Sequence, residues 1–420
     1  MHVAEKAPTH IIQTGQEPDT ANRGHLSYPD KSKKKKNNGK KQSFFRKLAG
    51  VLHLWLGLIS GIVIIIVALT GAIYAFQPEL TDAFQPYQFV EKADGPMLPV
   101  SRIRSIAEAQ LPGKTVSRIT FSGAERSVGV SFNKKKEGYY YMVYVNPYNG
   151  KVLQVKDMDR DFFRQVLNGH MHLWLPDPVG HYIIIYATLI FGLIIISGIV
   201  LWWPRKWSKS ARKQSFSVKL NASPKRLNYD LHNVLGFYAS WVMIFVVFTG
   251  LVWGFDVVRN AEYWVFSGGK KYPAKEKTAV AKRPVAPHQQ MASGEDPLDR
   301  IDAQIRERYN IAFGRTQFLL PSGEKGTVTV RYFPEQKRSF NADYLVFDPY
   351  TAAILPAGVR GKYVDADGGD KANRMNYDIH TGAIGGFPLR LIVFLAALIT
   401  ASLPVTGFYI WWGKRKKKQR

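Results

Sequence analysis

Histidines recur in this chain at the ends of long apolar runs, where an imidazole could bind a metal ion or a haem iron. His53 and His232 are each followed by Leu at the third position, Gly at the fourth and a Thr-Gly pair that begins at the seventeenth. Ionisable side chains are rare inside membrane spans, so histidines repeated there in one register indicate a function. Two neutral imidazoles on facing helices can hold one haem iron from both sides, and haem is therefore the first ligand to test.

Two further apolar runs end in Ser or Thr followed by Gly, and histidine lies upstream of both. His380 precedes Thr406 by twenty-six residues, and the same interval before Ser197 falls between His170 and His172. A leucine three residues after His172 repeats the pattern of the first two sites. This repeat favours His172 as the ligand, and His170 should then point elsewhere on a helix.

The candidate haem ligands form two predicted pairs, His53 with His232 and His172 with His380. The alternative for each single histidine is an interfacial anchor that hydrogen-bonds a lipid headgroup. His181 and Arg390 share a second register, each sixteen residues before the Ser-Gly or Thr-Gly pair of its run. Cationic or hydrogen-bonding groups at the membrane surface suit haem propionates, and we expect these two residues to contact them.

Four runs are long enough to cross a bilayer, at residues 51–76, 180–203, 234–255 and 388–412. A transmembrane helix needs about 20 mostly apolar residues. None of the four runs has Asp, Glu, Lys or Arg at its centre. The sequence therefore predicts an α-helical membrane protein with four transmembrane helices.

The net charge of +26 is concentrated beside these runs. Basic residues crowd the segments 1–45, 204–231 and 413–420, and the positive-inside rule places all three in the cytoplasm. The first of these segments is polar and lacks periodicity, which predicts a disordered basic tail. The segments 77–169 and 256–379 then lie outside. Anionic lipids explain the charge, and no nucleic-acid partner is expected.

The chain contains no cysteine. This excludes disulfides, thiolate zinc sites, cysteine-ligated iron–sulfur clusters and covalent haem attachment through C-x-x-C-H. It leaves b-type haem possible, because haem b needs only axial side chains and an apolar slot. The sequence also has no G-x-G-x-x-G motif and no P-loop, so neither a dinucleotide nor ATP is an expected ligand.

The two external segments resemble each other. Each has a helical stretch, at 101–110 and 298–309, followed by alternating strand-like runs. Each ends in a strand that enters an Asn-Pro-Tyr or Asp-Pro-Tyr turn, at residues 146–148 and 348–350, and a second strand leaves it. We expect two small α+β domains with antiparallel sheets, and a tandem duplication of span, domain and span.

The strand ending D/N-P-Y-x-x-x-[IV]-L resembles the PepSY module. Two such modules threaded through four spans, with L-H-x-x-L at span entrances and [ST]-G near span ends, resemble the PepSY-associated transmembrane family over about residues 45–415. That family includes di-haem inner-membrane reductases of ferric siderophores. The resemblance implies two haem b groups with bis-histidine ligation in a bacterial inner membrane. It also implies a haem-dependent oxidoreductase that releases iron from a ferric siderophore in the periplasm.

Two other functions remain open on the sequence alone. The histidines could hold copper or zinc in a metal-binding transport accessory, although they fall into two depths without carboxylate or thiolate neighbours. A haem-free regulator could use its PepSY-like modules to inhibit a peptidase, although one anchor would serve that purpose. For the reductase, the electron donor would be a quinol or a cytoplasmic reductase.

Overall fold

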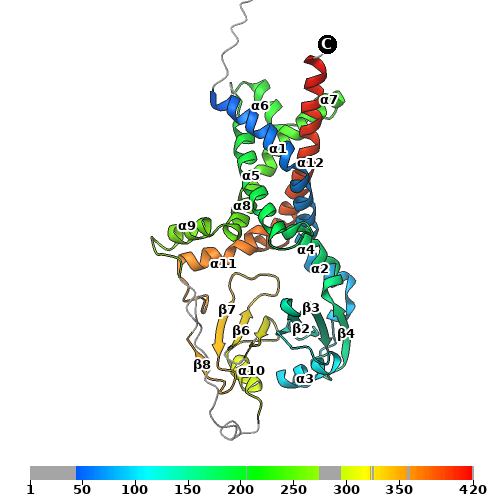
Figure 1. Ribbon diagram of the computed structural model, residues 1–420, viewed down its shortest axis with the longest axis vertical. Helices are drawn as coiled ribbons and strands as arrows, with labels where there is room; N and C mark the ends of the chain where they lie inside the picture. The colour runs from blue at the N-terminus through cyan, green and yellow to red at the C-terminus, as the bar shows by residue number, and fades with distance from the viewer. Residues whose placement is uncertain are drawn as a thin grey trace, which may run out of the picture. The chain divides into compact units, whose positions relative to one another are not determined.

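The computed structural model describes residues 44–204, 206–273, 295–321, 323, 326–356 and 360–418 (Figure 1). The predicted disordered tail at 1–45 lies almost wholly outside the described residues.

Four segments within this range are long and apolar enough to cross a membrane. They are α1 (Phe44–Ala75), α5 (Val179–Trp202), the run of α7 (Pro224–Asp230), the π-helical turn η4 (Leu231–Leu235) and α8 (Gly236–Gly254), and α12 (Gly386–Lys418) with the preceding turn η6 (Ala383–Gly385). Backbone groups in hydrocarbon must find partners within their own segment, and these runs satisfy that requirement as helices. The protein is a multi-pass helical membrane protein, as the sequence predicts.

The four long helices pack as a bundle in which α1 contacts α5 and α12, and α8 contacts the same two helices. Small residues allow close approach, as where Gly61 of α1 faces the ring of Pro404 in α12. A cluster of Ile195, Ala239, Met243, Val247 and Ala396 fills the contact between α5, α8 and α12.

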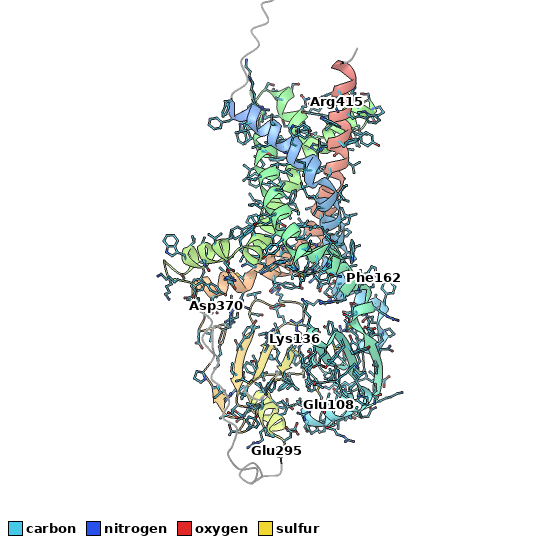
Figure 2. All side chains as sticks on the ribbon, viewed as in Figure 1. Glu108, Lys136, Phe162, Glu295, Asp370 and Arg415 are labelled. Atoms are coloured by element: carbon cyan, nitrogen blue, oxygen red, sulfur yellow. The ribbon has the colours of Figure 1, made fainter. Side chains whose placement is uncertain are left out.

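The basic segments gather at one end of the bundle. Helix α6 (Lys209–Phe216), helix α7 and the end of α12 near Arg415 lie there together (Figures 1 and 2). Phe162 and Asp370 mark the starts of two shorter helices at the opposite end (Figure 2). These are α4 (Phe162–His172) and α11 (Gly368–His380), and α2 (Gln77–Phe84) and α9 (Asp256–Phe266) lie at the same end.

The eight strands within the described residues form one antiparallel sheet, in the order β4-β3-β2-β1-β5-β6-β7-β8. The strands are β1 (Arg118–Phe121), β2 (Val128–Lys134), β3 (Tyr139–Val145), β4 (Val152–Asp157), β5 (Arg315–Leu319), β6 (Val328–Phe333), β7 (Asp343–Phe347) and β8 (Ile354–Leu355). The two expected α+β domains are therefore joined: β1 of the first segment pairs with β5 of the second, with Ile119 opposite Phe318.

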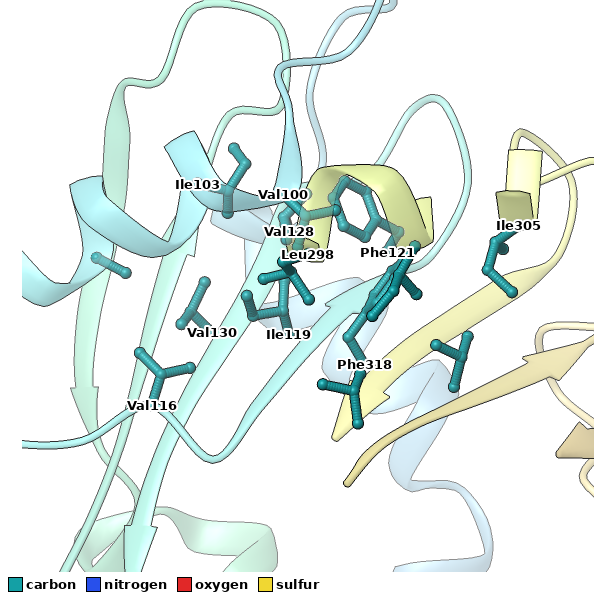
Figure 3. Packing of buried hydrophobic residues seen from close by; sticks show 14 of the residues in the cluster. Val100, Ile103, Val116, Ile119, Phe121, Val128, Val130, Leu298, Ile305 and Phe318 are labelled. Atoms are coloured by element: carbon teal, nitrogen blue, oxygen red, sulfur yellow. The ribbon is translucent and has the colours of Figure 1, made fainter. Parts of the chain in front are cut away.

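One face of this sheet carries a shared core (Figure 3). Alternate residues of the central strands, such as Val130 and Phe318, point into it. Two helices cover it: α3 (Val100–Gln110) and α10 (Pro297–Arg308), through Ile103 and Ile301 among others. Both helices lie where the sequence predicts helical stretches. Burial of their apolar faces against one common core explains why the two segments form a single layer.

The two predicted Pro-Tyr turns are present. The backbone N–H of Tyr148 donates to Asn146 Oδ1 at 2.9 Å, and that of Tyr350 donates to Asp348 Oδ1 at 2.8 Å. Each side chain therefore caps its own turn as the sequence indicates.

A buried carboxylate on α9 gives the fold a pH dependence. Glu262 is 5 % exposed, and its Oε2 accepts hydrogen bonds from the side-chain amides of Asn376 and Asn373. Burial raises the pKa of Glu262 above its ordinary value of 4.5. The protonated form is therefore favoured in the folded state, and the associated stability is lost as pH rises through the raised pKa.

Glu262→Gln should consequently stabilise the protein at neutral pH. The glutamine carbonyl can accept both amide hydrogen bonds without a buried charge. We expect the apparent melting temperature in detergent to rise by about 2 °C or more at pH 7 and to change less at pH 4. A lower melting temperature at both pH values would show that the carboxylate is needed.

Candidate functional site

The first histidine pair lies near the basic end of the bundle. His53 on α1 and His232 in the π-helical turn η4 have ring centroids 6.2 Å apart. Single π-helical turns are frequent at functional sites, and here the turn places His232 beside α1. The predicted pairing of these two histidines is present in the geometry.

The second pair lies near the sheet end, but it contains a different histidine from the expected one. His170 on α4 and His380 on α11 have ring centroids 6.2 Å apart, and Trp253 of α8 packs 5.0 Å from the His380 ring. His172, which the register favoured, instead places Nε2 3.0 Å from Asp177 Oδ1. The structure therefore brings His170, and not the favoured His172, beside His380.

The register does not predict this placement because the chain between the histidines and Ser197 is not one continuous helix. Helix α4 ends at His172, and the next two residues, Leu173 and Trp174, have φ angles of 54° and 58°. Helix α5 begins only at Val179. A count of residues back from Ser197 therefore crosses a turn, and beyond that turn it no longer predicts which way a side chain points.

Each of the four paired histidines rests on an [ST]-G pair of a neighbouring long helix. Nδ1 of His232 lies 2.9 Å from Thr406 Oγ1, and Nδ1 of His380 lies 2.9 Å from Thr249 Oγ1. The corresponding hydroxyl contacts of the other two histidines, His53 with Ser197 and His170 with Thr70, measure 3.2 and 3.4 Å. The [ST]-G pairs are visible in the sequence, but their contacts with the histidines are seen only in the structure.

These contacts fix which ring nitrogen carries the proton. The hydroxyls of Ser197, Thr70, Thr249 and Thr406 each donate to a carbonyl of their own helix, so they accept from the imidazole. A carbonyl oxygen also lies 3.1 Å from Nδ1 of His53, 2.9 Å from that of His170 and 3.0 Å from that of His380. Because a carbonyl can only accept, Nδ1 carries the hydrogen and Nε2 keeps its lone pair.

The glycine of each pair makes room for the ring. A Cβ atom at Gly71 would lie 2.9 Å from Cε1 of His170, and one at Gly198 would lie 3.1 Å from Cε1 of His53. At Gly407 the distance to His232 is again 3.1 Å, and at Gly250 the distance to His380 is 3.7 Å. Three of the four positions are thus tighter than an ordinary van der Waals contact.

Both pairs have the ring separation that a bis-histidine haem requires. A metal–imidazole bond is about 2 Å long and the ring centroid lies about 1 Å behind the bonding nitrogen, so opposite ligands have centroids about 6 Å apart. The two observed separations of 6.2 Å agree with this value. The ring planes are 88° and 74° apart, a twist that two imidazoles on one axis can adopt.

Burial favours the neutral form that ligation needs in the pair of His170 and His380. Burial, with the neighbouring His170 ring, lowers the pKa of His380 to about 3, and burial lowers that of His170. A metal ligand must be a neutral imidazole, so neither ring has to lose a proton before it binds. Within the described residues, no group of three His, Cys, Asp or Glu side chains could hold a bare metal ion.

The two remaining candidates have separate partners. The His181 ring lies 6.2 Å from the His172 ring, and His172 lines a cavity of about 250 Å³ together with Met171 and Leu175. Arg390 on α12 is 4 % exposed and forms an ion pair with Glu79 of α2, at 2.5 Å between Nη1 and Oε1. Their expected contact with haem propionates stays a prediction.

Comparison with known families gives one match. The model of the PepSY-associated TM region matches residues 51–414, which spans both histidine pairs, all four long helices and the sheet. No curated protein matches the chain significantly. Given this coverage, the chain belongs to the PepSY-associated transmembrane family.

Proposed function

We propose that this protein carries electrons across a bacterial inner membrane through two b-type haems and reduces ferric chelates, such as siderophores, on the side of the sheet. The observation that supports this most is the presence of two imidazole pairs with the same spacing and the same supports. His53 and His232 would hold the inner haem, and His170 and His380 the outer one. A bound haem b supplies one-electron chemistry between Fe(III) and Fe(II).

The hydroxyl contacts of the histidines repeat between the two halves of the chain. The ring of His53 contacts a hydroxyl of α5 and that of His170 one of α1, whereas His232 contacts α12 and His380 contacts α8. This exchange of contacts is the same in both halves, and it favours a tandem duplication of span, external segment and span. A regulator that needs one anchor has no use for four supported histidines.

The chain's own residues set where electrons can pass. His53 and Thr70, the support of His170, are seventeen residues apart on α1, which places the two layers about 25 Å apart along the helix. Nδ1–H donation to Ser, Thr and carbonyl oxygens fixes each ring and makes Nε2 the ligating atom. No side chain has to remove a proton in this scheme.

The electron balance is simple. A quinol or a cytoplasmic reductase on the basic side supplies one electron for each Fe(III) that becomes Fe(II). Reduction weakens binding of iron by hard anionic oxygen ligands, so the chelator releases the metal. The basic segments 204–231 and 413–420 and both termini would then be cytoplasmic, next to anionic lipids.

Vesicles of known sidedness test this function. After the haems are reduced, a ferric siderophore that cannot cross the membrane should reoxidise them when it is added on the side of the sheet. The same compound confined to the basic side should leave them reduced. Equal reoxidation from both sides, or reoxidation by oxygen or quinone alone, would contradict reduction of an external chelate.

A further inference from the structure

The face of the sheet opposite the shared core is strongly basic. Arg118 on β1 lies opposite Leu319, and Arg331 on β6 lies opposite Gln317, so both arginines stand on the strand face that points away from Ile119 and Phe318. With Arg315 of β5 and Arg360, which follows β8, they form what we call the arginine face: Arg118, Arg315, Arg331 and Arg360.

Two of these four cations lack a counter-ion within the described residues, whereas Arg315 donates to Gln336 O and Ser339 Oγ and Arg360 lies 3.9 Å from Asp370. Arg118 and Arg331 form no ion pair there, and the Nε atoms of Arg331 and Arg315 are buried without a hydrogen-bond partner. Arg331 instead lies over the ring of Tyr344 at 5.3 Å, and Arg315 lies over that of Phe333 at 4.1 Å. A half-buried charge without a counter-ion is costly, and an anionic ligand would remove that cost.

The nearby carboxylates are already occupied. Asp378 Oδ2 accepts from the backbone N–H groups of Ser339 and Phe340, at 2.8 and 2.7 Å. Asp370 pairs with Arg374 at 2.6 Å and lies 3.9 Å from Arg360. Burial is the main cause that lowers the pKa of Arg315 and Arg331, and the nearby charge of Arg118 lowers both further.

The arginine face is connected to the outer histidine pair through aromatic rings. Arg315 Nη2 donates to Ser339 Oγ, and the backbone N–H of Ser339 donates to Asp378 of α11, two residues before His380. The Tyr377 ring lies 6.5 Å from that of Trp253, which in turn lies 5.0 Å from His380. Arg374, also on α11, lies 5.2 Å from the Tyr344 ring that Arg331 contacts. A ligand on these arginines would therefore lie on the side of the sheet that contacts the helix of His380.

We propose that the arginine face binds an anionic, oxygen-rich metal chelate, such as a tricarboxylate complex of a trivalent ion. Guanidinium groups match carboxylate oxygens in pairs, and the half-buried ring of Tyr344 beside Arg331 adds apolar contact. The consequence of binding, electron transfer to iron, rests on the proposed function. Binding itself does not.

The test measures binding of gallium(III) citrate to the purified full-length protein by calorimetry, because gallium(III) resists reduction. We expect binding that weakens with salt, and Arg331→Gln and Arg118→Gln should each weaken it about tenfold or more. Arg331→Lys keeps the charge and should retain more affinity than Arg331→Gln. The matched control is Arg104→Gln on α3, a half-buried arginine paired with Glu108, which should bind as the wild type does.

Several outcomes would overturn the proposal. They are unchanged affinity in both glutamine variants, equal binding of metal-free citrate, and equal binding of a positively charged trihydroxamate complex of gallium. Loss of haem from a folded Arg331→Gln protein with chelate affinity intact would assign these arginines to the haem instead. Chelate binding by the arginines in a protein that fails to reduce iron would contradict only the proposed function.

Discussion

His170→Ala should remove the outer haem and leave the inner one, so that the purified protein keeps about half of its haem. The reason is that His170, not His172, lies 6.2 Å from His380 and donates through Nδ1 to the carbonyl of Val67. His380→Ala should have the same effect. Haem content per chain, measured after acid–acetone extraction, gives the result.

His172→Ala is the matched control, since it removes an imidazole two residues away on the same helix. Its ring contacts Asp177 and His181, and we expect both haems to remain. Loss of haem in His172→Ala with full retention in His170→Ala would restore the original register and refute the pairing in this structure.

Gly71→Ala should weaken outer haem binding about tenfold, whereas Gly250→Ala should change it little. Both glycines support a histidine of the outer pair, but a new Cβ would lie 2.9 Å from the His170 ring in one case and 3.7 Å from the His380 ring in the other. Alanine is a better helix former than glycine in both places, so helix propensity does not separate the two variants.

The Gly71→Ala and Gly250→Ala proteins are compared by the fraction of haem that each retains during dilution or competition with an apo-globin. The inner haem serves as an internal reference, because its ligands His53 and His232 rest on other helices. Equal losses in Gly71→Ala and Gly250→Ala would show that the [ST]-G glycines do not act through the space left for the ring.

Sequence patterns alone located the spans, the two external helices and the Pro-Tyr turns, because each of these depends on local periodicity or on the conformational limits of Pro and Asn. They also paired His53 with His232, since the helical backbone continues from each histidine to a Thr-Gly pair at the same spacing, through α1 in one case and through η4 and α8 in the other. Equal spacing in the sequence predicts equal positions in space only where the helix is continuous.

The rest depends on contacts between distant segments. The choice between His170 and His172 depends on the end of α4 before the start of α5. Leu173 and Trp174 form the turn with left-handed backbone angles, and because neither is a glycine, the sequence gives no local sign of this turn. The union of two modules into one sheet follows from edge pairing of β1 with β5, nearly two hundred residues apart in sequence. Arg118 and Arg331 read as ordinary surface residues until that pairing places them on one face.

The central claim is that each chain holds two haems through two histidine pairs, and absorption and electron paramagnetic resonance spectra of the purified protein test it most directly. Protein from haem-replete cells should contain two non-covalent haems per chain, both low-spin and six-coordinate, in agreement with the two 6.2 Å pairs. A colourless protein, or a haem with a single axial ligand in the unaltered chain, would contradict the account.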